Sequence, residues 1–340
     1  GLYWIGSAFF MADTYHFLLM PVAIILLPSL LAVFWGCACI CAKLINNYTK
    51  FSFLYVIVSL SLFEYLRAQI FTGFPWLMPS MIFASNVYFI QIFSFVGSFS
   101  ANLIILTISI LPFICFSSLK GKNALLWVLL IPIVILFFFG TLRYYNKKFL
   151  KNSDQLVTIV QPNIKQKNKW ILKNREYHLN KLLELSIKHR DSFNNKNRII
   201  IWPETSFEGS IPSEAKLLSN ISKKILQNKN TTLILGLLRT DKDKVFNSLV
   251  FLNSKGDITY NYDKIKLVPF GEYIPFRQYL SVLTDMLAPK DFTGGKLKSN
   301  PTIYGFENII TLICYEILFT KEIVRRLSKN TNLLINITND

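Results

Sequence analysis

The charged residues of this chain are distributed very unevenly, and this feature constrains the fold more than any other. Of the 340 residues, the first 142 include five Lys or Arg and two Asp or Glu, whereas residues 143–340 hold the other 32 basic and 18 acidic residues, a net charge of +14. We therefore expect a transmembrane helical domain over residues 1–142 and a polar domain over residues 143–340 that is long enough to bury a core. The composition excludes disordered, collagen-like and small disulfide-rich proteins.

The apolar half contains uncharged runs that are long enough to cross a membrane. Residues 17–42 include no charged side chain over 26 positions, and a helix that rises about 1.5 Å per residue would exceed a hydrocarbon core of roughly 30 Å. Gly73-Phe74-Pro75-Trp76 and Gly97-Ser98 interrupt a longer uncharged stretch, because Gly and Pro break helices. Four spans are expected, over residues 17–42, 51–71, 99–119 and 123–142.

The second expected span carries Glu64 and Arg67, three residues apart on one helical face. Such a pair is costly within a membrane unless it faces protein or water, so it marks a functional edge or a membrane boundary. The basic residues that flank the spans favour a polar half outside the cytoplasm, because Lys and Arg in short loops determine the orientation more than those next to a long domain. If residues 81–96 cross the membrane instead of lying at its surface, the polar half is placed on the opposite side.

The polar half alternates strand-like and helix-like segments, which predicts an α/β layered fold. Helices are expected over residues 172–187, 214–226 and 320–327, and strands over residues 156–164, 199–201, 231–238, 246–252, 258–262, 309–313 and 333–337. Several of these strands end in polar clusters, and open α/β sheets place their chemistry at such ends.

Three of these clusters contain residues that can carry acyl transfer. Glu204 follows a buried strand and Pro203, and Lys264 and Glu272 flank a loop that contains Pro and Gly. Cys314 ends another strand, with Glu316 two positions later on the same predicted face. Taken singly, these are usually a solvated carboxylate, a surface lysine and a core cysteine. Together they form a complete set, in which Cys314 attacks a carbonyl, Glu204 takes the thiol proton and Lys264 stabilises the oxyanion.

Other chemistries find less support in the sequence. The three histidines lie beside no candidate Ser or Cys nucleophile, which argues against Ser-His and Cys-His hydrolases. Cys37, Cys39 and Cys41 have a spacing that suggests a metal, but they lie in an apolar run without nearby His or carboxylate, so we expect core packing and no metal.

The motifs resemble the carbon-nitrogen hydrolase (nitrilase) superfamily and, within it, the bacterial apolipoprotein N-acyltransferase family. They run through the chain in family order: Gly73-Phe74-Pro75-Trp76, Gln161-Pro162-Asn163-Ile164, Trp170, Trp202-Pro203-Glu204, Leu267 to Glu272, Cys314-Tyr315-Glu316 and Asn336 to Asp340. The resemblance implies a nitrilase-like αββα sandwich next to a multi-span membrane domain. It also implies that Glu204, Lys264 and Cys314 are catalytic, and that Glu272, Glu316, Tyr315, Trp170 and Trp76 support the site or bind substrate.

The resemblance further implies a function and a location. An acyl chain from a phospholipid would be held as a thioester and passed to the α-amino group of S-diacylglyceryl-cysteine at an apolipoprotein N-terminus. The enzyme would be a monomer in the bacterial inner membrane with a periplasmic catalytic domain, and it would use no cofactor and no nucleic acid. The open alternatives are a membrane-tethered amidase that uses water as acceptor, and a transporter or sensor. A third alternative is an inactive fragment, since Gly1 and the strand-like end at Asp340 suggest a sandwich and a membrane domain that are both incomplete.

Overall fold

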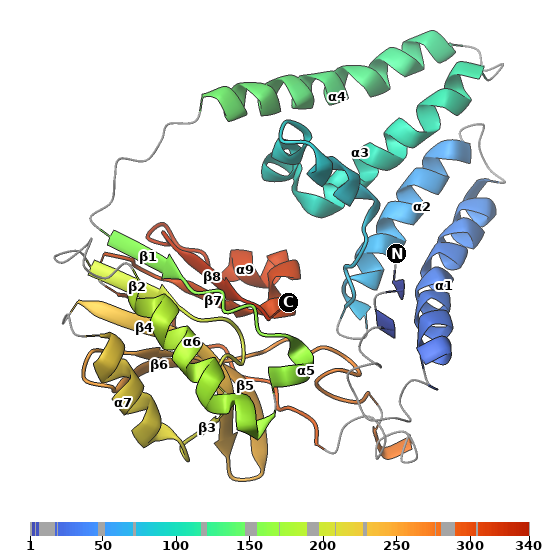
Figure 1. Ribbon diagram of the computed structural model, residues 1–340. Coiled ribbons are helices and arrows are strands. Elements are labelled where there is room, and N and C mark those ends of the chain that lie inside the picture. The colour runs from blue at the N-terminus through green and yellow to red at the C-terminus, as the bar shows by residue number, and fades with distance from the viewer. Residues whose placement is uncertain are drawn as a thin grey trace. The chain divides into compact units, whose positions relative to one another are not determined.

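The computed structural model describes residues 2–3, 5–6, 18, 20–46, 52–70, 73–116, 121–146, 155–169, 171–188, 197–207, 209–226, 230–275, 277–279, 290–303 and 305–339. The chain divides into two compact units, residues 1–150 and 151–340 (Figure 1). The predicted boundary after residue 142 falls inside the last helix of the first unit, which ends at Tyr145.

The first unit consists of long apolar helices. Its main elements are α1 (Met20–Asn46), α2 (Ser52–Arg67), α3 (Ile92–Phe116) and α4 (Lys122–Tyr145), with the short 3₁₀ helices η4 (Pro79–Ser85) and η5 (Phe89–Gln91) before α3. Among the described residues, three segments are long and apolar enough to cross a membrane: Met20–Ile45, Phe89–Phe116 and Lys122–Tyr145.

The helix found at the second expected span, residues 51–71, is shorter than predicted. Helix α2 has 16 residues, which at about 1.5 Å per residue gives about 24 Å, less than a typical hydrocarbon core. The helix ends at Arg67, whose carbonyl accepts a hydrogen bond from the N–H of Phe74 at 3.0 Å. The chain therefore folds back on the end of α2 in place of a longer span.

The expected break at Gly97 is present, because this residue has φ 73° and interrupts the helical geometry of α3. Gly tolerates this left-handed backbone conformation, which costs other residues energy. Residues 81–96 form 3₁₀ turns and the start of α3 instead of a separate membrane-crossing helix.

Glu64 and Arg67 face protein inside the first unit. Arg67 Nη2 lies 2.6 Å from Glu64 Oε2, and both side chains are buried. The indole N–H of Trp35 on α1 donates to the other oxygen of Glu64. The pair thus ties α1 to α2, which satisfies the condition under which buried charges are tolerated among apolar helices.

The second unit contains a six-stranded mixed sheet and a two-stranded parallel pair. Strands β1 (Gln155–Ile159), β2 (Asn197–Ile201) and β4 (Thr231–Asp241) are parallel neighbours, and β5 (Lys244–Leu252) and β6 (Ile258–Asp263) extend the sheet antiparallel from β4. The short β3 (Ser210–Ile211) also pairs with β4, while β7 (Ile310–Ile313) pairs with β8 (Leu334–Ile337). The helices are α5 (Gln166–Lys169), α6 (Arg175–Ile187), α7 (Ala215–Ile225) and α9 (Thr320–Arg326).

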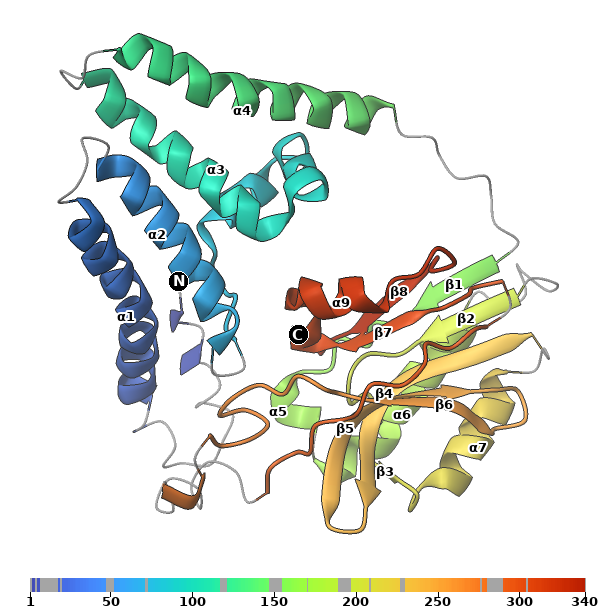
Figure 2. The same ribbon diagram turned by 180° about the vertical axis from the view of Figure 1, so that it is seen from behind.

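The two faces of the larger sheet pack into two different cores. Alternate residues such as Leu233 and Leu235 pack with Leu182 of α6 and Leu218 of α7, whereas Ile234 between them packs with the β7–β8 pair. Both views place α9 on the side of β7 and β8 that faces away from the larger sheet (Figure 2). The layers therefore follow the expected nitrilase-like αββα order, and period-2 alternation of apolar side chains explains why each strand contributes to both cores.

Candidate active site

Glu204 lies in the turn that follows β2, as the sequence predicts. The N–H of Trp202 still donates to Ile234 O on β4 at 2.8 Å, and Pro203 then has no N–H to continue the ladder. The N–H of Glu204 donates to Thr338 O after β8 at 3.2 Å. Gly236 on β4 makes room for this turn, since a Cβ there would lie 2.6 Å from Glu204 Cα. Glu204 is 9% exposed, so its carboxylate is held in a buried site instead of being solvated.

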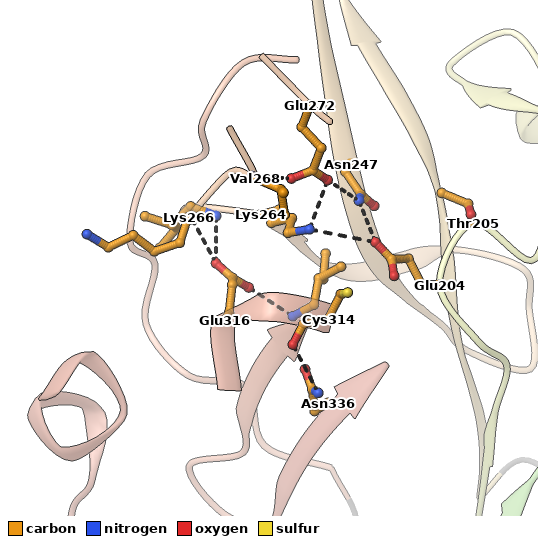
Figure 3. A network of polar contacts seen from close by, with 12 residues as sticks. Glu204, Thr205, Asn247, Lys264, Lys266, Val268, Glu272, Cys314, Glu316 and Asn336 are labelled. Atoms are coloured by element: carbon orange, nitrogen blue, oxygen red, sulfur yellow. Dashed lines mark hydrogen bonds and ion pairs between the residues drawn. The ribbon is translucent and has the colours of Figure 1, made fainter. Parts of the chain in front are cut away.

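Lys264 follows β6 directly and is the most central group of the site (Figure 3). Its Nζ lies 2.8 Å from Glu272 Oε1 and 3.8 Å from Glu204 Oε1, and the residue is 1% exposed. The amide of Asn247 on β5 donates to the same two carboxylates, at 2.7 Å to Glu204 and 3.0 Å to Glu272. The structure thus brings together the loops that carry Glu204 and Glu272, which are 68 positions apart in the sequence.

Cys314 follows β7 at the point where the strand becomes a 3₁₀ helix, η9 (Cys314–Leu318). Its φ of 52° lies in the left-handed region, where a residue with a Cβ is strained by about 1–3 kcal/mol. The carbonyl of Cys314 accepts a hydrogen bond from Asn336 Nδ2 at 3.3 Å, and the thiol points toward Glu204 and Lys264 (Figure 3). This turn presents the sulfur at the strand end instead of within the ladder.

The prediction that Cys314 and Glu316 share one strand face is wrong, because the strand ends at Ile313. Glu316 lies on η9 and reaches back to accept the N–H of Ile313 at 2.8 Å. Its other oxygen accepts the N–H groups of Ile265 and Lys266 and the hydroxyl of Tyr262. Glu316 therefore ties the Cys314 turn to the loop that starts at Lys264, without sharing a strand face with the thiol.

The charges of the site shift the proton affinities of Glu204 and Lys264. Burial raises the pKa of Glu204, although the charge of Lys264 and the Asn247 hydrogen bond oppose this. Burial alone would lower the pKa of Lys264, but the charges of Glu272 and Glu204 outweigh burial and raise it. Because Lys264 is closer to Glu272 than to Glu204, Glu272 takes most of the ion pairing and Glu204 keeps a high proton affinity, as a general base requires.

The remaining predicted site residues have different outcomes. Tyr315 is buried and packs edge-on against Phe319 with ring centroids 5.1 Å apart. Trp76 belongs to the first unit, where its ring lies 6.3 Å from that of Phe74, and its role stays a prediction. Trp170 lies outside the described residues. Across the part of the chain that the structure describes, no group of three or more His, Cys, Asp or Glu side chains is arranged as a metal site.

Three residues of this site were not predicted from the sequence: Asn247, Gly236 and Lys169. Lys169 is buried, and its Nζ donates to Thr205 Oγ1 at 2.6 Å and to Glu204 O at 3.3 Å. A glycine within the apolar strand around Gly236 is a recognisable signal of close backbone approach. No local signal identifies Asn247 or Lys169, because their importance comes from contacts with distant segments.

The arrangement can support nucleophilic acyl transfer. It combines a thiol at a constrained turn, a buried carboxylate of high proton affinity and a buried ammonium group within one network. A nucleophile, a base and a cation for a developing oxyanion are the three groups that such chemistry needs.

Comparisons with known proteins give matches over both units. The family model for carbon-nitrogen hydrolase matches residues 156–340, and the model for the apolipoprotein N-acyltransferase N-terminal domain matches residues 1–111. The whole chain aligns with proteins named apolipoprotein N-acyltransferase from Allorhizobium ampelinum, at 30% identity, and Rhodopseudomonas palustris, at 28%. The chain spans 65% and 66% of the length of these two relatives.

Solved structures match the chain at lower identity. An amidase of the nitrilase superfamily from Nesterenkonia AN1 has 14% identity and a TM-score of 0.34, covering 48% of this chain and 59% of the amidase chain. The glutamine-dependent NAD⁺ synthetase from Acinetobacter baumannii has 18% identity and a TM-score of 0.33, covering 48% of this chain and 30% of the synthetase. On the family model, which spans the second unit from β1 to the last residue, the chain belongs to the carbon-nitrogen hydrolase family.

Proposed function

We propose that the chain carries the catalytic centre of a membrane acyltransferase that moves an acyl chain from a phospholipid to the N-terminal α-amino group of S-diacylglyceryl-cysteine in apolipoproteins. The observation that carries the proposal is the network of Glu204, Lys264 and Glu272 beside Cys314. Two further facts support it. In the part of the chain that the structure describes, three helices are apolar and long enough to cross a membrane, and the relatives named apolipoprotein N-acyltransferase align over the whole chain.

In the first half-reaction, Glu204 takes the proton of the Cys314 thiol while the sulfur attacks the ester carbonyl of the phospholipid. The ammonium of Lys264 stabilises the negative oxygen of the tetrahedral intermediate. When that intermediate collapses, the ester C–O bond breaks and the protonated Glu204 gives its proton to the departing lysophospholipid oxygen. The products are a thioester at Cys314 and a lysophospholipid.

In the second half-reaction, the α-amino group of the acceptor attacks the thioester carbonyl. Glu204 takes a proton from the amine, the C–S bond breaks, and the proton returns to the sulfur of Cys314. The product is an amide, and the thiol is restored. The proposed location is the bacterial inner membrane with the second unit on the periplasmic side, where lipid-linked acceptors are presented.

The test uses the full-length protein in vesicles of a phospholipid with one isotopically labelled acyl chain. We expect mass spectrometry to find the labelled chain on the Cys314 peptide and hydroxylamine, which cleaves thioesters, to release it. Cys314→Ala should carry no label, whereas Cys115→Ala in the first unit should be labelled like the parent. Acylation at a different residue would contradict the assignment.

A second measurement separates transfer from hydrolysis. A synthetic peptide with an S-diacylglyceryl-cysteine N-terminus is added to the labelled enzyme, and we expect the label to appear on the peptide amine. Release of free labelled fatty acid with no acylated peptide would indicate the amidase-type reaction with water as acceptor.

A further inference from the structure

A second buried lysine lies next to the proposed base, and the half-reactions above do not use it. Lys169, at the end of α5, is 4% exposed. Its ammonium donates to Thr205 Oγ1 at 2.6 Å and to the carbonyl oxygen of Glu204 at 3.3 Å. A cation this deeply buried needs such partners, because burial of a charge without them is costly.

The turn that Lys169 contacts has an unfavourable backbone conformation. Thr205 has φ 41°, which is uncommon for a β-branched residue. Such a conformation persists only where the surroundings hold it. Hydrogen bonds hold this turn in place. The N–H of Glu204 donates to Thr338 O, and the N–H of Gly236 donates to Pro203 O at 3.2 Å. A further contact is the hydrogen bond from Lys169 to Thr205. Of these contacts, Lys169 alone brings a charge, and charge-assisted hydrogen bonds are the stronger kind.

The groups that face the Glu204 carboxylate oppose one another. Glu272 raises its proton affinity, and Lys264, Asn247 and Lys169 lower it. Lys264 also pairs with Glu272 at 2.8 Å and still lowers the proton affinity of Glu204 the most, and Lys169 adds a smaller effect in the same direction. Lys169 donates to the Thr205 hydroxyl and to the Glu204 carbonyl oxygen, so it acts on Glu204 through the turn, and its charge also acts on the carboxylate through space.

We propose that Lys169 is a positioning residue for Glu204: it fixes the backbone of the Glu204–Thr205 turn and keeps a second positive charge beside the base. The inference rests on the proposed role of Glu204 as the base that takes the Cys314 proton. Lys169 touches no reacting atom in this scheme, so its effect reaches the chemistry through Glu204.

The test compares Lys169→Met and Lys169→Arg with Lys165→Met, a matched control because Lys165 is an exposed lysine just before α5. The full-length protein in phospholipid vesicles is assayed for the rate of Cys314 acylation against pH. Without the Lys169 charge, Glu204 holds its proton to higher pH, so the acid limb of the profile should move upward. A shift of one pH unit lowers the rate on that limb about tenfold, and the loss should shrink as the pH rises.

Lys169→Arg should restore much of the parent profile, and Lys165→Met should match the parent. Lys169→Met with the pH profile of Lys165→Met would overturn the inference. If Lys169→Met does not fold, Thr205→Val removes the hydroxyl acceptor and keeps the side-chain shape. We then expect a smaller shift in the same direction, and an unshifted Thr205→Val profile would overturn the inference.

A second readout separates this inference from the proposed function. Iodoacetamide alkylates the Cys314 thiolate without any acyl transfer, and peptide mass spectrometry measures its rate at that residue against pH. If the parent forms no thioester but Lys169→Met shifts the alkylation profile, the positioning role stands and the proposed function fails. If the parent forms the thioester and neither profile shifts, the proposed function stands and the positioning role fails.

Discussion

Gly236 has no side chain at the point where the Glu204 turn crosses β4, and this absence is needed for the site. A Cβ at Gly236 would lie 2.6 Å from both Glu204 Cα and Thr205 N and 2.8 Å from Pro203 O. Real Cβ atoms do not approach backbone this closely, so the turn would have to move. Glu204, the proposed base, is thus positioned by backbone packing as much as by hydrogen bonds.

Gly236→Ala should therefore abolish acylation of Cys314 and lower the free energy of unfolding by about 1–3 kcal/mol, the usual cost of overpacking. Gly36→Ala is the control, because a Cβ at Gly36 in α1 meets no atom within 4 Å. The measurements are thioester formation and thermal unfolding in detergent. Normal thioester formation by Gly236→Ala would show that the turn tolerates displacement and that the close approach has no catalytic role.

At the scale of elements, an ion pair joins β4 to β6 across the sheet. Arg239 Nε and Nη2 each donate to Asp263 at 2.9 Å, and Ser248 Oγ donates to the same carboxylate at 2.6 Å. Burial alone would raise the pKa of Asp263, but the hydrogen bonds from Arg239 and Ser248 outweigh it and lower the pKa. Because Asp263 precedes Lys264, this pair also fixes the strand end that carries the ammonium group of the proposed site.

A lowered pKa gives stability that is present above the unfolded value of about 3.9 and is lost as the pH falls through the lower folded value. We expect Asp263→Asn to reduce the free energy of unfolding at pH 7 by about 2 kcal/mol and to lack this part of the acid dependence. Asp241→Asn is the control, since Asp241 lies 3.8 Å from the same Arg239 but is 61% exposed, and should cost less than about 0.5 kcal/mol. Equal unfolding curves for both variants at pH 7 would contradict this account.

The sequence predicted elements of the second unit well and their contacts less well. Apolar, β-branched runs located β2, β4 and β5 to within a few residues, because these strands are buried on both faces and such runs are a local signal. The partly exposed β6 was also located to within one residue. The two-residue β3 and the four-residue α5 were missed, since segments this short have no periodicity. Glu204, Lys264, Glu272 and Cys314 were named from motifs, whereas the position of Glu316 was mispredicted because the left-handed turn at Cys314 cannot be seen in the pattern.

In the first unit, the ion pair of Glu64 and Arg67 on α2 allows a prediction about the stability of the packing of α2 on α1. Arg67→Leu leaves the Glu64 carboxylate buried against Trp35 without its cation, which should cost about 3–5 kcal/mol. The double variant Glu64→Gln with Arg67→Leu should recover part of this loss, because no unpaired charge remains. Unfolding of the detergent-solubilised protein measures the cycle, with Lys43→Leu at the exposed end of α1 as the control. Additive losses in the double variant would mean that the two charges are not coupled.

At the scale of the whole molecule, the chain combines helices that suit a lipid environment with a polar half of net charge +14. Two explanations of that charge compete. It can draw the second unit toward anionic lipid headgroups, where each nearby basic residue is worth about 1 kcal/mol at a membrane surface. Alternatively, the abundance of Lys and Asn reflects the base composition of the genome and has no functional consequence.

The two explanations differ in how the rate of Cys314 acylation depends on lipid charge and salt. If the charge draws the unit to headgroups, vesicles that mix anionic with zwitterionic phospholipids of the same acyl chains should be used faster than purely zwitterionic vesicles. This advantage should vanish near 1 M NaCl, where the screening length is about 3 Å. Detergent micelles with the same donor are the control, since a neutral micelle surface offers no such attraction. Equal rates in both vesicles at low salt would support the compositional explanation, because an attraction worth even 1.4 kcal/mol changes a binding constant about tenfold.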